Sequence, residues 1–215
     1  MENLIQTIAV YAIPVLLAIT LHEAAHGYVA RMFGDSTAWF LGRVTLNPLK
    51  HIDPVGTLLV PGVILLMSAV AGGGGMLFGW AKPVPVNFAN LRQPKRDMIW
   101  VAGAGPLSNL LQAVLWALFL KLQLAFGFEE RFFFEVAMAG INVNLVLMAL
   151  NLLPLPPLDG GRILVGLLPH RAAVAVARIE PYGFFILIAL LVSGTLGFFI
   201  GPFLQLGQGI VRLFL

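Results

Sequence analysis

The sequence predicts an all-α polytopic membrane protein, and three observations lead to that fold class. The chain of 215 residues is 59% hydrophobic and only 11% charged, and its mean hydropathy is +0.92. A soluble domain cannot bury so large an apolar share, so a bilayer must cover the remainder. Uncharged stretches approach or exceed the roughly 20 residues that cross a bilayer as a helix. They are residues 3–21, 54–81, 98–120, 136–158 and 181–211.

The first third of the chain predicts one long helix followed by irregular structure. Residues 4–33 are expected to form the helix, and it should be retained because Glu2 stands where a signal peptide carries basic residues. Residues 38–47 mix aromatic and β-branched side chains, which predicts a short strand or β-hairpin-like insertion. Residues 55–79 are apolar and broken by glycines 72–75, and residues 80–88 alternate proline with apolar residues as an extended interfacial loop.

Three further helices are predicted over residues 96–122, 132–153 and 183–213, the last interrupted at Gly194 and beyond. No internal repeat divides the chain, so we expect one integral-membrane domain, residues 1–215. The small residues of V-A-G-A-G-P-L-S-N, positions 101–109, predict close approach of a neighbouring helix.

The motif H-E-A-A-H at positions 22–26 lies in the first predicted helix. Four residues at 3.6 per turn place His22 and His26 on one face, where two imidazoles can bind one zinc ion. Glu23 lies one step round the helix, from where it can take a proton from a water at the metal. Ionisable residues that follow a long apolar segment raise the free energy of membrane insertion. That cost favours a functional role for these three residues over the alternative that they only form a polar face of the helix.

A catalytic zinc site normally has three protein ligands, and the absence of cysteine restricts them to nitrogen and oxygen. Asp159 is the preferred third ligand because it ends an apolar segment where prolines break the backbone at membrane depth. The alternative for Asp159 is a surface turn with an ion pair to Arg162. The other acidic or histidine candidates are His51, Asp53, Asp97 and His170.

These motifs resemble those of the site-2 protease family of intramembrane zinc metalloproteases, in particular its small bacterial members without a PDZ domain. The resemblance rests on L-H-E-A-A-H-G-Y at 21–28, N-L-L-P-L-P-P-L-D-G-G-R at 151–162 and G-P-L-S-N at 105–109. It implies one Zn²⁺ ion on His22, His26 and Asp159, with Glu23 as general base. It also implies that Asn151 polarises the scissile carbonyl or orients the substrate.

The resemblance further implies a three-helix catalytic core, formed by residues 4–33, 96–122 and 132–153, with additional membrane segments. Residues 55–79 are additional to that core, and a re-entrant hairpin there would keep both motifs at the same depth. The expected partners are the lipid bilayer and a membrane protein or peptide substrate, and the expected location is the cell membrane, the inner membrane of a bacterium. Asn109 is expected to hydrogen bond between helices, and His51 and His170 match no ligand position.

The sequence argues against two other function classes. A metal transporter would need further ligands along a path across the bilayer, and the uncharged stretches supply none. An inert scaffold would not need Glu23. Nucleic-acid binding is not expected because Lys and Arg are dispersed over the loops.

The orientation of the chain in the membrane does not follow from its charges. A five-crossing arrangement divides the Lys and Arg residues seven to six between the two sides of the membrane. The orientation therefore rests on the resemblance, which implies an active site on the cytoplasmic side.

Overall fold

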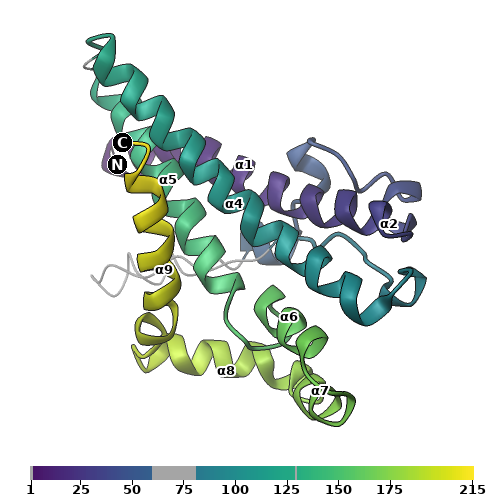
Figure 1. Ribbon diagram of the computed structural model, residues 1–215. Helices are drawn as coiled ribbons and strands as arrows, with labels where there is room; N and C mark the ends of the chain where they lie inside the picture. Colours follow the sequence, from purple (N-terminus) through teal and green to yellow (C-terminus); the bar gives the residue numbers. More distant parts are fainter. Residues whose placement is uncertain (1, 60–80, 129) are drawn as a thin grey trace.

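The chain folds around three long helices, α1 (Glu2–Met32), α4 (Pro94–Ala125) and α5 (Arg131–Asn151), in the computed structural model shown in Figure 1. The structure describes residues 2–59, 81–128 and 130–215. Within these residues, the three long helices have the length and apolar composition to cross a membrane. The bent pair α7 (His170–Ala177) and α8 (Glu180–Val192) would make a fourth crossing if it formed one span.

The remaining helices are short or lie outside the three-helix core. The short ones are α2 (Thr37–Phe40), η1 (Pro48–Lys50), η2 (Pro54–Leu59), η3 (Phe88–Asn90) and α6 (Asp159–Leu167). The last helix, α9 (Leu196–Arg212), packs along α5 (Figure 1).

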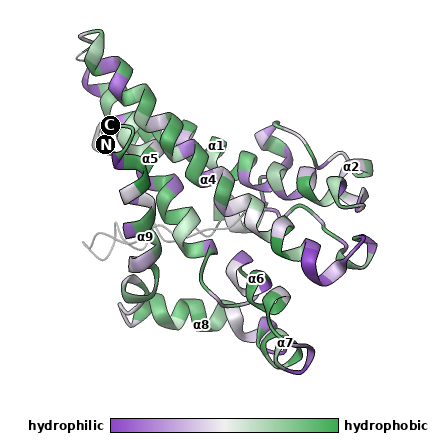
Figure 2. Ribbon diagram, viewed as in Figure 1, coloured by the Kyte–Doolittle hydropathy of each residue, from purple (hydrophilic) through white to green (hydrophobic). Residues whose placement is uncertain are grey.

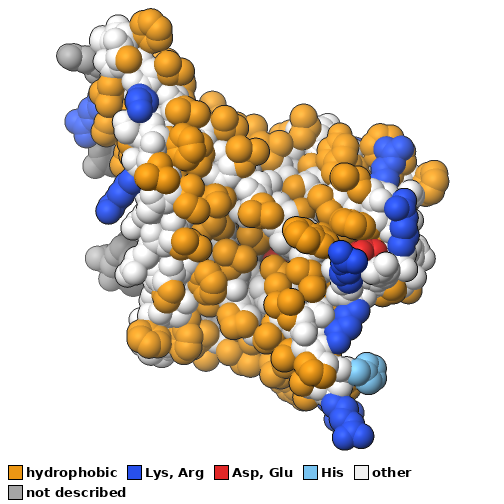
Figure 3. Space-filling model, viewed as in Figure 1, with side chains coloured by type: hydrophobic (Ala, Val, Ile, Leu, Met, Phe, Trp, Pro, Cys, Tyr) orange, Lys and Arg blue, Asp and Glu red, His pale blue; other side chains and the backbone are white. Residues whose placement is uncertain are grey.

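Small buried residues let the core helices pack closely. Ala113 and Ala117 of α4 and Ala137 of α5 have no exposed surface, and Leu145 and Met148 complete the same cluster. Many other large apolar side chains are exposed on the outside of the helices, as they are when lipid is the solvent. Figure 2 shows α8 as almost uniformly hydrophobic, and Figure 3 shows apolar side chains over much of one face. The expectation of a multi-pass helical membrane protein therefore agrees with the fold.

The long predicted helices are confirmed, and the break near Gly194 separates α8 from α9. Gly194 has φ +71°, a left-handed conformation that glycine adopts without strain. The helices α6 and α7 were not predicted, because prolines and glycines on either side obscured two helices of only nine and eight residues.

The predicted strand or hairpin over residues 38–47 is wrong, since no strand is found among the described residues. Asp35 accepts hydrogen bonds from the backbone N–H and hydroxyl of Thr37, and so starts the helical turn α2. Gly42, at φ +63°, ends it. Two side chains of this segment contact α1 rather than a partner strand, with Val44 against Gly27 and the Trp39 ring against Arg31.

The predicted re-entrant hairpin over residues 55–79 lies almost entirely outside the described residues. Its described flanks lie side by side, because the Lys82 N–H donates to the His51 carbonyl at 3.0 Å. His51 and Lys82, on either side of that segment, therefore lie at the same end of the core. That arrangement lets α1 and α5 run parallel, as the three-helix core requires.

Candidate metal centre

His22 and His26 lie one turn apart near the C-terminal end of α1, and both side chains are buried. The ring centroids are 4.7 Å apart and the rings are nearly perpendicular. Their Nε2 atoms approach to 3.1 Å. The four-residue spacing of the motif thus brings two ligand nitrogens to one point, as helix geometry predicts.

Asp159 comes to the same point from a distant part of the sequence. It is the first residue of α6, and its Oδ2 lies 3.2 Å from His22 Nε2 and 3.3 Å from His26 Nε2. Arg162 lies instead near Glu180, with Nη2 3.7 Å from Oε1, so the predicted alternative of an Asp159–Arg162 ion pair is not observed. The three candidate ligands are brought together in one buried cluster.

The donor set fits a zinc ion by distance. Ligands at about 2.0–2.1 Å from zinc in a tetrahedral arrangement lie roughly 3.3 Å from one another. The three observed separations of 3.1, 3.2 and 3.3 Å are close to that value. Two imidazoles and one carboxylate, with one position left open, form the donor set typical of a catalytic zinc site.

The charge state of Asp159 also suits a metal ligand. Burial on its own opposes ionisation, but the positive charge that His26 and His22 can carry outweighs it and lowers the pKa of this carboxyl group below its ordinary value. Metal binding requires an ionised carboxylate together with neutral histidines, and the lowered pKa favours the first of these.

The outer nitrogen of each histidine is hydrogen bonded, which holds the rings in place. His26 Nδ1 lies 2.7 Å from the carbonyl oxygen of Val101, which can only accept, so Nδ1 carries the proton and, in the neutral ring, Nε2 has the lone pair that can bind metal. His22 Nδ1 lies 2.6 Å from Oδ1 of Asn109. Both partners belong to α4, so this helix orients the rings carried by α1.

Gly105 explains why α4 can approach so closely. A Cβ atom there would lie 2.5 Å from His22 Cε1 and from His26 Nε2, inside the space around the ligand nitrogens. The predicted close helix approach at positions 101–109 is thus found at the candidate metal centre itself. Sequence reasoning missed this role for Gly105. The hydrogen bonds between helices that were predicted for Asn109 are found, to the Ala18 carbonyl on α1 and to Asn144 on α5, but its contact with His22 was not predicted.

Glu23 is half-buried beside the two histidines, and its Oε2 accepts a hydrogen bond of 2.6 Å from the backbone N–H of Val84. Val84 belongs to the irregular segment 81–87, which was predicted as an extended loop. Asn151 is the last residue of α5, and its Nδ2 donates to the Leu147 carbonyl at 3.0 Å. That bond uses one of the two Nδ2 hydrogens of Asn151 and leaves the other free of it.

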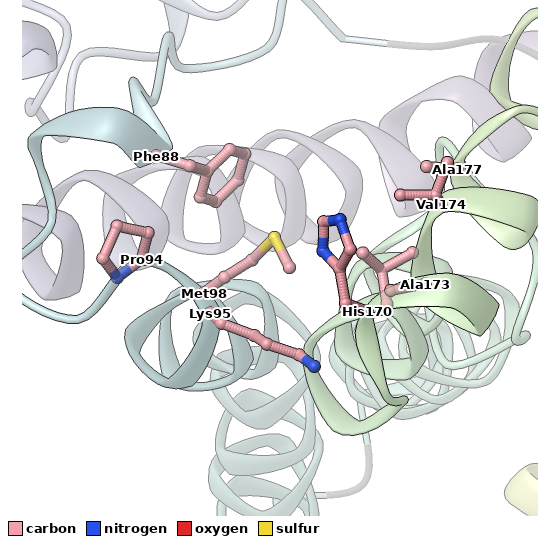
Figure 4. A pocket seen from close by; sticks show the side chains of 9 residues that line it. Phe88, Pro94, Lys95, Met98, His170, Ala173, Val174 and Ala177 are labelled. Carbon is pink, nitrogen blue, oxygen red and sulfur yellow. The ribbon is translucent and has the colours of Figure 1, made fainter.

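The other residues considered as a third ligand lie elsewhere. Asp97 accepts from the Gln93 N–H at the start of α4, and Asp53 accepts from the Gly56 N–H. His51 is almost fully buried, with Nε2 3.0 Å from the Thr45 carbonyl. His170 begins α7 and lines a cavity of about 290 Å³ between α7 and the start of α4, shown in Figure 4, which none of the three candidate ligands lines.

Known proteins resemble the chain over most of its length. "Putative zinc metalloprotease YwhC" of Bacillus subtilis is 40% identical over 208 residues, covering 94% of this chain and 89% of that protein. "Putative zinc metalloprotease Rip2" of Mycolicibacterium smegmatis is 32% identical over 182 residues, covering 84% and 66%. "Putative zinc metalloprotease MJ0611" of Methanocaldococcus jannaschii is 27% identical over 146 residues, covering 66% and 62%. No solved structure matches the chain significantly.

The model of peptidase family M50 matches residues 128–194, which include α5 and the segment that carries Asp159. The Bacillus relative extends the similarity across nearly the whole chain. The chain belongs to peptidase family M50, the site-2 protease family, and is a zinc metalloprotease.

Proposed function

We propose that residues 1–215 form one membrane domain that acts as an intramembrane zinc metalloendopeptidase. Its substrates would be peptide bonds in membrane-spanning or membrane-adjacent protein segments, with His22, His26 and Asp159 as zinc ligands. The observation that carries the proposal is the convergence of three ligand atoms within 4.8 Å, two of them on an apolar helix long enough to cross a bilayer. Family membership supports the protease chemistry.

Bound zinc supplies Lewis acidity, which activates water and polarises a carbonyl group. In this proposal Glu23 accepts a proton from the attacking water and passes it to the leaving amine. The hydrogen bond from the Val84 N–H holds one carboxylate oxygen of Glu23 and leaves the other available for this task. Asn151, the last residue of α5, would polarise the scissile carbonyl or orient the substrate through its amide, as the resemblance to the site-2 protease family implies.

A transmembrane substrate must unwind before attack, because a helix uses its carbonyl oxygens in internal hydrogen bonds. The extended segment 81–87 is the proposed surface that holds the unwound chain as an added strand. It lies beside Glu23 through Val84, and Arg43 Nη2 donates to the Lys82 carbonyl at 3.0 Å. The other predicted extended segment, residues 38–47, is largely helix and turn and is not part of this proposal.

The distribution of basic residues supports a cytoplasmic active site. Ten of the thirteen Lys and Arg residues belong to the end of the molecule that holds the candidate metal centre. They are Arg31, Arg43, Lys50, Lys82, Arg92, Lys95, Arg96, Arg162, Arg171 and Arg178. Lys121, Arg131 and Arg212 belong to the other end. The positive-inside rule then orients the metal centre toward the cytoplasm, a bias that the predicted five-crossing arrangement had hidden.

The proposal is tested with Glu23→Gln, which keeps the shape of the side chain but cannot accept the proton. We expect zinc content close to that of the wild type and loss of cleavage of a model membrane peptide by at least about 100-fold. Activity within tenfold of the wild type would show that another group is the base. Accessibility of reporter tags at both chain ends, measured in cells, would check the orientation independently.

A further inference from the structure

Asn109 of α4 links the candidate zinc ligand His22 to both neighbouring core helices. It has no exposed surface, and its Oδ1 lies 2.6 Å from His22 Nδ1. Its Nδ2 lies 3.2 Å from the Ala18 carbonyl of α1 and 2.9 Å from Oδ1 of Asn144 on α5. Asn144 is equally buried, and its own Nδ2 lies 2.9 Å from the Gly140 carbonyl.

The direction of every hydrogen bond in this chain follows from its two carbonyl groups. The Ala18 carbonyl can only accept, so the Asn109 atom facing it must be the donating Nδ2. The Gly140 carbonyl requires the same of Asn144, which turns Asn144 Oδ1 toward Asn109. The amide oxygen of Asn109 must then face His22, and an oxygen without hydrogens can only accept. His22 Nδ1 is therefore the donor, and its Nε2 carries the lone pair.

We propose that Asn109 and Asn144 are positioning residues, which fix the tautomer and ring orientation of His22 so that Nε2 faces the zinc ion. The inference rests on the proposed role of His22 as a ligand. The two asparagines act in sequence, because Asn144 holds the amide of Asn109 and Asn109 holds the imidazole. Outer hydrogen bonds of this kind raise metal affinity by roughly 10–100-fold.

A role in helix packing alone makes a different prediction. If Asn109 only held the helices together, its bonds to the Ala18 carbonyl and to Asn144 would not govern the imidazole, and the His22 ring would be free to exchange tautomers. The distinguishing observable is therefore the position of the imidazole proton in the metal-free protein, not stability or activity.

The first experiment measures that proton directly by ¹⁵N NMR of histidine-labelled, metal-free Glu23→Gln protein in detergent. The chain has only four histidines, and His22→Gln identifies the His22 signals. We expect His22 at a pH where it is neutral to show the Nδ1–H tautomer as the dominant form. A dominant Nε2–H form, or a mixture of both, would overturn the proposal even if the protein is a fully active protease.

The second experiment measures zinc affinity by competition with a chelator. Asn109→Leu should lower affinity by about 10–100-fold, and Asn144→Leu by less, because the Ala18 carbonyl still orients Asn109. The matched control is Gln112→Leu, one turn further along α4, where a buried amide has no hydrogen-bond partner among the described residues. Equal losses in Asn109→Leu and Gln112→Leu, or unchanged affinity in Asn109→Leu, would refute the positioning role.

Discussion

The segment of α1 that carries His22 and His26 is positioned differently from the segment 152–161 that carries Asp159. One turn of helix sets the distance between the histidines, and α4 then orients each ring through Val101 and Asn109. Segment 152–161 has no such helical frame before Asp159. Its shape depends on glycine contacts, since a Cβ at Gly160 would collide with the Leu152 and Leu153 carbonyls and one at Gly161 with the backbone of Pro156.

Because of this difference, the histidine pair and Asp159 should be displaced by different substitutions. The histidine pair depends on the close approach of one helix, which a single atom at Gly105 would prevent. The position of Asp159 depends on a layer of packing that extends to α8, because a Cβ at Gly183 would overlap the Pro156 carbonyl. The comparison can be tested at the ligands, at each glycine, and at a site remote from both.

Removal of a ligand should have the largest effect. His22→Ala, His26→Ala and Asp159→Ala should each lose bound zinc while remaining inserted in the membrane, because each lacks one of three ligands. Zinc content per protein, measured after purification, checks this expectation. Full zinc retention in Asp159→Ala would show that Asp159 is not a ligand. His51→Ala and His170→Ala serve as controls and should keep their zinc.

A methyl group at Gly105 should disturb the histidine pair nearly as much. Gly105→Ala places a Cβ 2.5 Å from both rings, so either the rings or α4 must move, and activity should fall on the order of 100-fold. Gly103→Ala, on the same helix, is the matched control because an added Cβ there meets no atom within 4 Å. The control should retain activity. Similar activity in both variants would mean that α4 does not constrain the rings.

A methyl group at Gly183 of α8 should displace Asp159 without displacing the histidines. The displacement would pass through segment 152–161, against which α8 packs. Gly183→Ala is expected to lower zinc affinity roughly tenfold, since the displaced loop carries only one of the ligands. Gly209→Ala in α9 is the control, with open space around the added Cβ. Competition with a chelator measures the zinc affinity of both variants. Unchanged zinc affinity in Gly183→Ala would show that packing against α8 does not determine the position of Asp159.

Substitution of Asp35 should leave the site intact and affect only stability. Burial alone would raise the pKa of Asp35, but hydrogen bonds from Thr37, Asn87 and Asn90 lower it below the ordinary value. A lowered pKa in the folded state stabilises the fold above the ordinary pKa near 4, and the stabilisation is lost as pH falls toward the folded-state value. Asp35→Asn should therefore be less stable at pH 7 by about 1–3 kcal/mol.

The pH dependence of the stability difference shows whether the carboxylate of Asp35 is responsible for it. Because protonated Asp35 resembles asparagine, the difference in melting temperature between wild type and Asp35→Asn should shrink below pH 4. Thermal unfolding in detergent at pH 7.5 and pH 3.5 measures it. A difference that stays constant with pH would attribute the effect to packing rather than to the carboxylate.

Much of the fold could be predicted because long apolar runs have few alternatives in a bilayer. The helices α1, α4 and α5 were expected within a few residues of their observed ends. The strand expected over residues 38–47 failed for a local reason, since Asp35 and Gly42 favour a helical turn more strongly than the β-branched residues favour a strand. The helices α6 and α7 escaped prediction because each is too short to show a clear period.

The sequence by itself determined the spacing of His22, Glu23 and His26 on one helix, and a proline-broken segment that leads to Asp159. These features are local, so helix geometry and backbone chemistry suffice to predict them. Only the tertiary structure decided that Asn109, Gly105 and Val84 meet them. Residues on a membrane helix are apolar on every side, so hydropathy does not reveal which face of α4 packs on α1 or at what depth. That register follows from the packing of three helices together.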